Sequence, residues 1–193
     1  WRRPGEAVER WMYRLAGVDP AASMTWMQYA MSVIVFSTMS FLAVYLLQRC
    51  QVWLPLNPQQ LGTVTADSSF NTAVSYATNT NWQGYVGEAT MSYLTQMLGL
   101  AVQNFLSAAA GIAVLIALIR GFTRREAGTI GNFWVDFTRS TLYVLLPLSF
   151  ILAVVLAAQG VVQSFAPYQQ ATLVEPVIIQ VPAMSADGTP QLD

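Results

Sequence analysis

The residues best suited to chemistry lie between positions 67 and 85, a stretch with no charge between Asp67 and Glu88. Their hydroxyl and amide groups are too polar to face lipid, yet a long apolar run lies on each side. Hydroxyl, amide and backbone carbonyl oxygens are ligands of hard cations. We therefore predict a re-entrant loop, in which a short helix enters the membrane and an extended return lines a water-filled path. The polar residues are Ser68, Ser69, Asn71, Thr72, Ser75, Thr78, Asn79, Thr80, Asn81 and Gln83.

Helix length limits how far this stretch can reach. A pore helix is predicted over residues 67–77, capped by Asp67 or Ser68, and it would be about 15 Å long, half of a bilayer core. Its C-terminal end would lie near the membrane midplane, where the helix dipole favours a cation. The return strand would then offer successive backbone carbonyls, and asparagine tolerates the positive φ that such a filter needs. Its residues are Thr78, Asn79, Thr80 and Asn81.

Three uncharged apolar runs are long enough to cross a hydrocarbon core about 30 Å thick. They predict membrane spans at about residues 26–48, 90–119 and 140–165, and Pro147 is expected to bend the third. Small and amide residues share one face of the second span, and such a stripe faces protein or water. Gln103, at mid-depth, is therefore either a pore-lining group or a helix-packing contact. The stripe consists of Gln96, Gly99, Gln103, Ser107 and Gly111.

The charge distribution predicts the orientation of the spans. Only 10% of the 193 residues are charged and 54% are hydrophobic, whereas about a quarter of the residues in soluble domains are charged. All nine basic residues are arginines, and all except Arg49 lie in residues 1–20 or 120–139, which the positive-inside rule places in the cytoplasm. The net charge of -1 gives no indication of a nucleic-acid partner, and the single Cys50 excludes an internal disulfide framework.

Local patterns give further expectations. Residues 1–20 predict a short amphipathic helix at the membrane surface, with a juxtamembrane linker as the alternative. Asp136 and Arg139, one helical turn apart, are expected to form a structural ion pair. A single return strand supplies too few oxygens for a cation, so several strands must converge, from four copies of the chain or from a longer chain. An external polar loop is the alternative to the filter.

Several sequence blocks closely resemble the KdpA family, the potassium-binding, channel-like subunits of bacterial Kdp P-type ATPases. The resemblance extends from about Glu9 to Gln163. Its most specific blocks are Thr-Asn-Thr-Asn-Trp-Gln at residues 78–83 and Val-Gln-Asn-Phe-Leu-Ser-Ala-Ala at residues 102–109. Further matching blocks are Gly131 to Arg139 and Thr141 to Ser149.

The resemblance implies an all-α membrane protein with a Trk/Ktr/HKT-like repeat unit of span, re-entrant pore helix with filter strand, and span, followed by one further span. Four linked repeats would surround one potassium filter. Residues 78–81 would be the first repeat's filter strand, holding K+ mainly through backbone carbonyls, and Gln83 would lie at the vestibule. K+ is the implied transported ion, and no organic cofactor is implied.

The same resemblance implies KdpB, which hydrolyses ATP, together with KdpC and KdpF as partners in the bacterial inner membrane. No catalytic residues are expected in this chain, which is interpreted as an N-terminal fragment. The predicted segments are a juxtamembrane helix (1–23), the first repeat (24–119), a cytoplasmic loop (120–139), the first span of a second repeat (140–165) and an external segment (166–193). A passive channel or symporter subunit of the same superfamily is the alternative.

Overall fold

The computed structural model describes residues 5–123, 128–162, 164–169, 183–184 and 190–191, so most of the predicted external segment lies outside it. The described chain is helical apart from two short antiparallel strands, β1 (Ala183–Met184) and β2 (Pro190–Gln191). Its helical elements are α1 (Glu6–Ala16), α2 (Trp26–Cys50), the 3-10 turn η1 (Gln51–Trp53), α3 (Ala66–Ala77), α4 (Gly87–Thr90), the π-helical η2 (Thr95–Ala101), α5 (Val102–Thr123), α6 (Phe133–Arg139), the π-helical η3 (Ser140–Leu145) and α7 (Leu146–Ala158).

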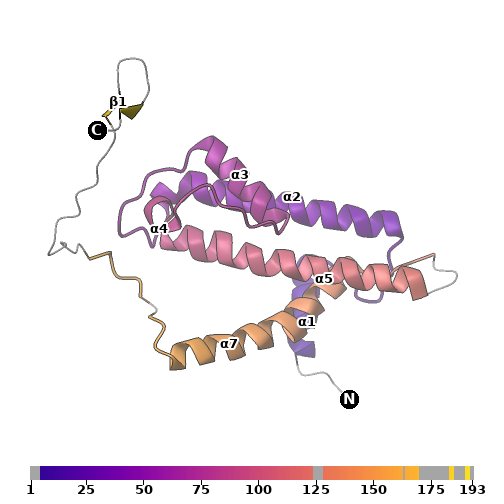
Figure 1. Cartoon of the computed structure of the whole chain (residues 1–193). Helices are drawn as coiled ribbons and strands as arrows, with labels where there is room; N and C mark the ends of the chain where they lie inside the picture. Colours follow the sequence, from indigo (N-terminus) through magenta and orange to yellow (C-terminus); the bar gives the residue numbers. More distant parts are fainter. Residues whose placement is uncertain (1–4, 124–127, 163, 170–182, 185–189, 192–193) are drawn as a thin grey trace.

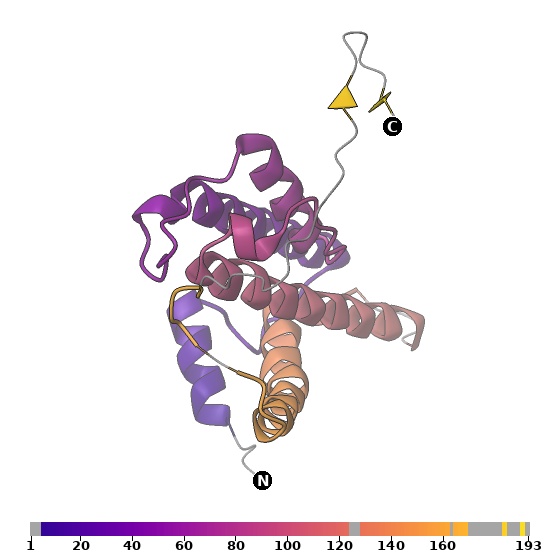
Figure 2. The ribbon, with the colours of Figure 1, turned by 60° about the vertical axis from the view of Figure 1, so that its left-hand side comes forward.

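Three continuous helical segments are long and apolar enough to cross a membrane. They cover Trp26–Trp53, Thr95–Thr123 and Phe133–Ala158, with 28, 29 and 26 residues. In Figure 1, α2 and α5 lie side by side, whereas α7 diverges from them. Figure 2 shows the same divergence from another direction. The predicted class, an all-α membrane protein with three spans, is confirmed.

Helix α3 packs antiparallel on the C-terminal half of α2. Near its start, Gln48 donates from Nε2 to the carbonyl of Ser69 at 3.3 Å. One turn further, the fully buried Ala73 lies in a core cluster with Val44 and Tyr76. Twelve residues give α3 a length of about 18 Å, so it ends well before the far end of α2.

The start of α3 corrects the predicted cap. The helix begins at Ala66 with Thr65 as its N-cap, and no side-chain hydrogen bond caps it. Asp67 lies inside the first turn instead, where a carboxylate still interacts favourably with the helix dipole.

The other end of the bundle is closed by the segments that precede α2 and α6. Thr25 and Gln28 form a capping box at the start of α2. Just before α2, Met24 pairs with Gly131 in an isolated antiparallel bridge. The N–H of Met24 donates to the carbonyl of Gly131 at 2.7 Å, and the N–H of Ile130 donates to the carbonyl of Met24 at 2.9 Å. Gly131 has φ 107, and a Cβ there would collide with the guanidinium of Arg120. These contacts fix the entry to α6 against the entry to α2.

A buried ionic cluster joins three helices at this end. Arg120 of α5 binds Asp136 of α6 through two hydrogen bonds of 2.5 and 2.8 Å. Tyr29 of α2 donates to the same carboxylate at 3.2 Å and to the carbonyl of Ala113 at 2.7 Å. The predicted pair of Asp136 with Arg139 is therefore wrong, because Arg139 pairs with Glu9 at 3.2 Å.

The helix ends also differ from the predicted bounds. The third span begins at Phe133 rather than 140, because the Asn132 side chain accepts hydrogen bonds from the N–H groups of Trp134 and Val135 and starts the helix there. It ends at Ala158, and Gly160 follows with φ 83. The second span extends to Thr123. The π-helical η3 ends two residues before Pro147. Its wider turn accommodates the proline, which has no N–H to donate to the preceding turn.

Candidate functional site

The turn that follows α3 places the predicted filter residues on the molecular surface. The N–H groups of Thr80 and Asn81 both point back to the carbonyl of Ser75, at 2.8 and 3.2 Å, and that of Asn79 points to Tyr76 at 3.2 Å. The segment is thus a compact turn against the last turn of α3, rather than the freely extended return that was expected. Successive N–H groups directed at one oxygen form a backbone nest. Because the carbonyl of a peptide unit lies opposite its N–H, the carbonyls of Thr78, Asn79 and Thr80 point away from these acceptors.

The backbone angles explain how this turn is built. Asn79 has φ 57 and Asn81 has φ 58, whereas Thr78 has φ -90. Asparagine adopts positive φ more readily than most residues, as expected from the sequence. Among the hydrogen bonds of the described residues, none ends on a carbonyl oxygen of residues 78–81. Four backbone acceptors are therefore available on a turn in which Thr78, Asn79 and Thr80 are exposed and Asn81 is half-buried.

Side chains of the second span hold the two asparagines in place. Asn81 donates from Nδ2 to Oδ1 of Asn104 at 3.0 Å and to Oδ1 of Asn79 at 3.3 Å. Ser107 donates to Oδ1 of Asn79 at 3.1 Å. Asn104 and Ser107 lie about ten residues into a helix of 29 residues, so the turn lies about 15 Å along the span. A pore helix that reaches halfway through the membrane is expected to place the turn at this depth.

Hydroxyl groups brace the turn from within. Ser75 donates from Oγ to the carbonyl of Trp82 at 2.9 Å, and the hydroxyls of Thr78 and Thr80 lie 2.9 Å apart. Gln83, predicted at the vestibule, donates from Nε2 to the phenolic oxygen of the buried Tyr76 at 2.5 Å. The predicted residues 78–81 and 83 are therefore brought together around the end of α3. Their role in ion binding stays a prediction.

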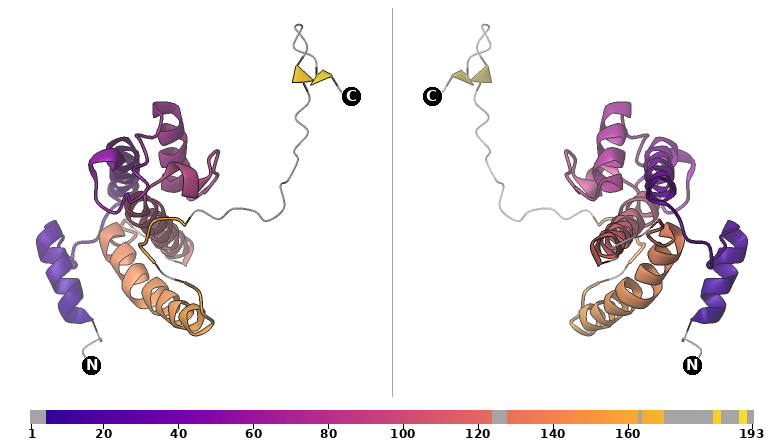
Figure 3. Two further views of the ribbon diagram at one scale, coloured as in Figure 1. Left: turned by 90° about the vertical axis from the view of Figure 1, so that its left-hand side faces the viewer. Right: turned by 90° about the vertical axis from the view of Figure 1, so that its right-hand side faces the viewer.

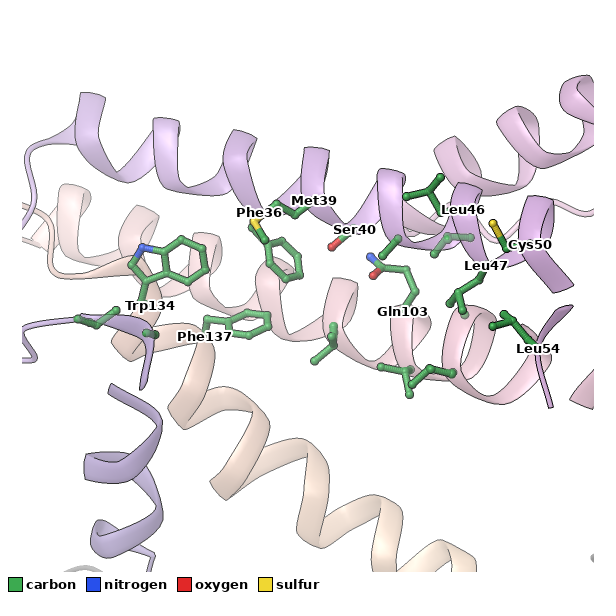
Figure 4. Close-up of a pocket in the computed structure, with 18 residues that line it drawn as sticks. Phe36, Met39, Ser40, Leu46, Leu47, Cys50, Leu54, Gln103, Trp134 and Phe137 are labelled. Atoms are coloured by element: carbon green, nitrogen blue, oxygen red, sulfur yellow. The ribbon is translucent and has the colours of Figure 1, made fainter. Parts of the chain in front are cut away.

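Gln103 is not part of this assembly. It is buried, with 4% of its surface exposed, and lies about 100° around α5 from Asn104. It shares its face with Ser107 one turn further on, but no hydrogen bond of the described residues joins Gln103 to the turn. Figure 4 shows it between α2 and α5, close to Ser40, in an apolar groove of about 930 Å³. Within the described part of the chain its Nε2 atom has no hydrogen-bond partner.

Replacement of Gln103 by leucine tests whether this amide acts in ion binding. We expect unchanged potassium affinity and a free energy of unfolding that is equal or about 1 kcal/mol higher, because a buried amide without a partner is unfavourable. Potassium-dependent ATPase activity and thermal unfolding of the full-length protein in its complex measure the two quantities. A clear loss of potassium affinity would instead assign Gln103 to the ion path.

Sequence reasoning did not assign a role to Asn104, Tyr76 or Ser75. Asn104 and Ser107 both belong to the specific block at residues 102–109, which was the one available signal. Asn104 was missed because it lies beside the small and amide stripe of the second span, not on it.

Comparison with known proteins matches the family described as "Potassium-transporting ATPase A subunit", KdpA, over residues 2–187. The potassium-transporting ATPase potassium-binding subunit of Ralstonia pickettii is 66% identical over 186 residues, which are 96% of this chain and 32% of the relative. The proteins of the same name from Methylococcus capsulatus and Bordetella pertussis are 62% and 61% identical over 97% and 96% of this chain. The chain spans about a third of the length of these relatives.

Proposed function

This chain belongs to the KdpA family of potassium-transporting ATPase A subunits, and we propose that it supplies the first of four filter repeats of a subunit that binds extracellular potassium and conducts it across the bacterial inner membrane. The observation that carries the proposal is the turn at residues 78–81. It combines four carbonyl oxygens that accept no hydrogen bond from the described residues, positive φ at two asparagines and a position at mid-span.

The chemistry of this turn fits a dehydrated monovalent cation. Backbone carbonyls replace the hydration shell of K+ in known filters, and no carboxylate lies within residues 68–87 to favour a divalent ion. One turn supplies only part of the oxygens that an ion needs. Its exposed surface therefore faces the axis on which the three further repeats converge.

The rest of the complex follows from this role. ATP hydrolysis belongs to KdpB, while KdpC and KdpF complete the assembly, and this chain binds and conducts without catalysis. The names of the relatives, which describe a potassium-binding subunit of an ATPase, support this division. Residues 1–20 and 120–139 lie on the cytoplasmic side in this arrangement, and the turn opens to the outside.

Replacement of Gln83 by alanine in the full-length subunit tests the proposal. Loss of the hydrogen bond to Tyr76 removes about 1 kcal/mol of support for the turn, so we expect potassium affinity to fall about fivefold and discrimination against rubidium to weaken. Potassium- and rubidium-stimulated ATP hydrolysis of the reconstituted complex measures both effects.

Gln159, at the end of α7, offers a matched control, because its replacement by alanine removes an exposed amide far along the chain from the turn. This variant should keep the parent's affinity. Unchanged affinity and unchanged ion discrimination in the Gln83 variant would contradict the filter assignment. Potassium flux that needs no ATPase partner would favour a passive channel.

A further inference from the structure

The N-terminal helix α1 is held against the third span by a buried carboxylate. Glu9 and Tyr13 are 4% and 5% exposed, and Arg139 and Tyr13 both donate to Oε2 of Glu9 at 3.2 Å. Burial opposes ionisation of Glu9, but hydrogen bonds from Tyr143 and Arg139 outweigh it, so the pKa of Glu9 lies below its ordinary value. The ionised anchor fixes which face of α1 points to the protein.

The position of Arg139 indicates the depth of α1. Arg139 is the last charged residue before an uncharged run in which η3 has six residues and α7 has thirteen. At about 1.5 Å per residue this run is about 28 Å long, close to the thickness of a hydrocarbon core. Arg139 therefore marks one boundary of the core, and α1 lies at that boundary. Figures 1 and 3 show α1 running across the direction of α2 and α5, as a helix in the plane of the interface does.

The side chains of α1 divide into three faces. Successive residues are 100° apart, so Glu9 and Tyr13 share the face toward the protein. A second face carries an apolar stripe at spacing i, i+3 and i+7, formed by Val8, Trp11 and Leu15. These three side chains are 48%, 62% and 68% exposed. The third face carries the exposed Arg10 and Arg14. An apolar stripe flanked by arginines, with tryptophan at its centre, is typical of helices at a lipid interface.

The arginines of the third face are available to a ligand. Within the part of the chain that the structure describes, the two ion pairs are Arg120 with Asp136 and Arg139 with Glu9, so neither Arg10 nor Arg14 is neutralised. Both carry positive charge beside the apolar stripe, whose burial away from water is favourable. A ligand that binds both faces needs acyl chains for the stripe and an anionic headgroup for the arginines.

We propose that α1 is a binding site for anionic phospholipid, with Val8, Trp11 and Leu15 among the acyl chains and Arg10 and Arg14 at the headgroup phosphates. The ion pair between Glu9 and Arg139 fixes the position of this site relative to the third span. The site is independent of the turn at residues 78–81.

Photo-crosslinking of the full-length subunit in its complex tests this site. The subunit carries p-benzoylphenylalanine in place of the exposed Trp11 and is reconstituted in nanodiscs of equal parts phosphatidylglycerol and phosphatidylcholine with matched acyl chains. Mass spectrometry then gives the ratio of the two lipids attached at position 11. We expect phosphatidylglycerol to be favoured by about fivefold for each arginine. The double replacement Arg10→Gln and Arg14→Gln should bring the ratio close to one.

Two controls keep the result interpretable. Arg49→Gln changes an arginine at the other end of α2 and should leave the lipid ratio unchanged. Raising the salt concentration from about 0.05 M to about 0.5 M should lower the ratio of the parent protein without any substitution, because the attraction is screened. A parent ratio near one, or attachment of position 11 mainly to another polypeptide, would overturn the proposal.

Discussion

Replacement of Asn81 by valine should lower the potassium affinity of the full-length subunit by about tenfold to a hundredfold. A β-branched residue at φ 58 is strained by about 1–3 kcal/mol, and the hydrogen bonds of the Asn81 amide to Asn79 and Asn104 are lost as well. The turn is then expected to relax and to misplace its carbonyls. Every 1.4 kcal/mol of lost binding energy is a factor of ten in affinity.

The substitution Asn81→Gly separates the backbone from the side chain. Glycine adopts positive φ without strain but lacks the amide, so its variant should retain more affinity than the valine variant. Potassium-stimulated ATP hydrolysis of the reconstituted complex compares the three proteins. Equal losses in the glycine and valine variants would show that the amide, not the backbone, is the important group. No loss in the valine variant would contradict the filter assignment altogether.

Much of the fold could be predicted because membrane solvation is a strong and simple constraint. Uncharged runs of more than twenty residues have few alternatives to a spanning helix, and a polar stretch between them cannot face lipid. The pore helix was predicted at residues 67–77 and is found at Ala66–Ala77. Asparagine was expected to tolerate the positive φ of a filter, and both Asn79 and Asn81 have it.

Contacts between distant segments could not be predicted in the same way. Spacing along the chain joined Asp136 to Arg139, but the bidentate geometry offered by Arg120 outweighs a neighbour at one helical turn. The arginines of residues 120–139 predict a cytoplasmic loop there, but the third span already begins at Phe133 and contains Asp136 and Arg139. Those charges are tolerated in the helix because each is paired, Asp136 with α5 and Arg139 with α1.

The candidate site shows the same limit on a smaller scale. The residues of the turn were predicted from their polarity and from the length of the helix before them. The residues that hold it, Asn104 and Ser107, come from a helix more than twenty positions away. An amide in a long apolar run signals a polar contact within the membrane, but the pattern does not name the partner.

Replacement of Asp136 by leucine should destabilise the protein by about 2–3 kcal/mol. The substitution leaves the Arg120 guanidinium without its carboxylate and Tyr29 with one acceptor instead of two. Breaking a fully buried ion pair costs about 3–5 kcal/mol, and we expect a smaller loss here because 29% of the Arg120 side chain is exposed to solvent. Thermal unfolding of the full-length protein in detergent measures the loss. The exposed Asp67 provides a control, and its replacement by asparagine should cost less than about 1 kcal/mol.

A second substitution separates the ion pair from the shape of the site. Combining Arg120→Met with Asp136→Leu removes both charges. The double variant therefore has no unpaired guanidinium in the protein interior, whereas the Asp136→Leu variant does. The double variant should therefore be more stable than the Asp136→Leu variant by at least about 1 kcal/mol. If instead the two losses add, the cluster contributes through packing at the junction of α2, α5 and α6 rather than through charge. Phe133, which is fully buried and packs edge-on against Tyr29, is one such packing contact at this junction.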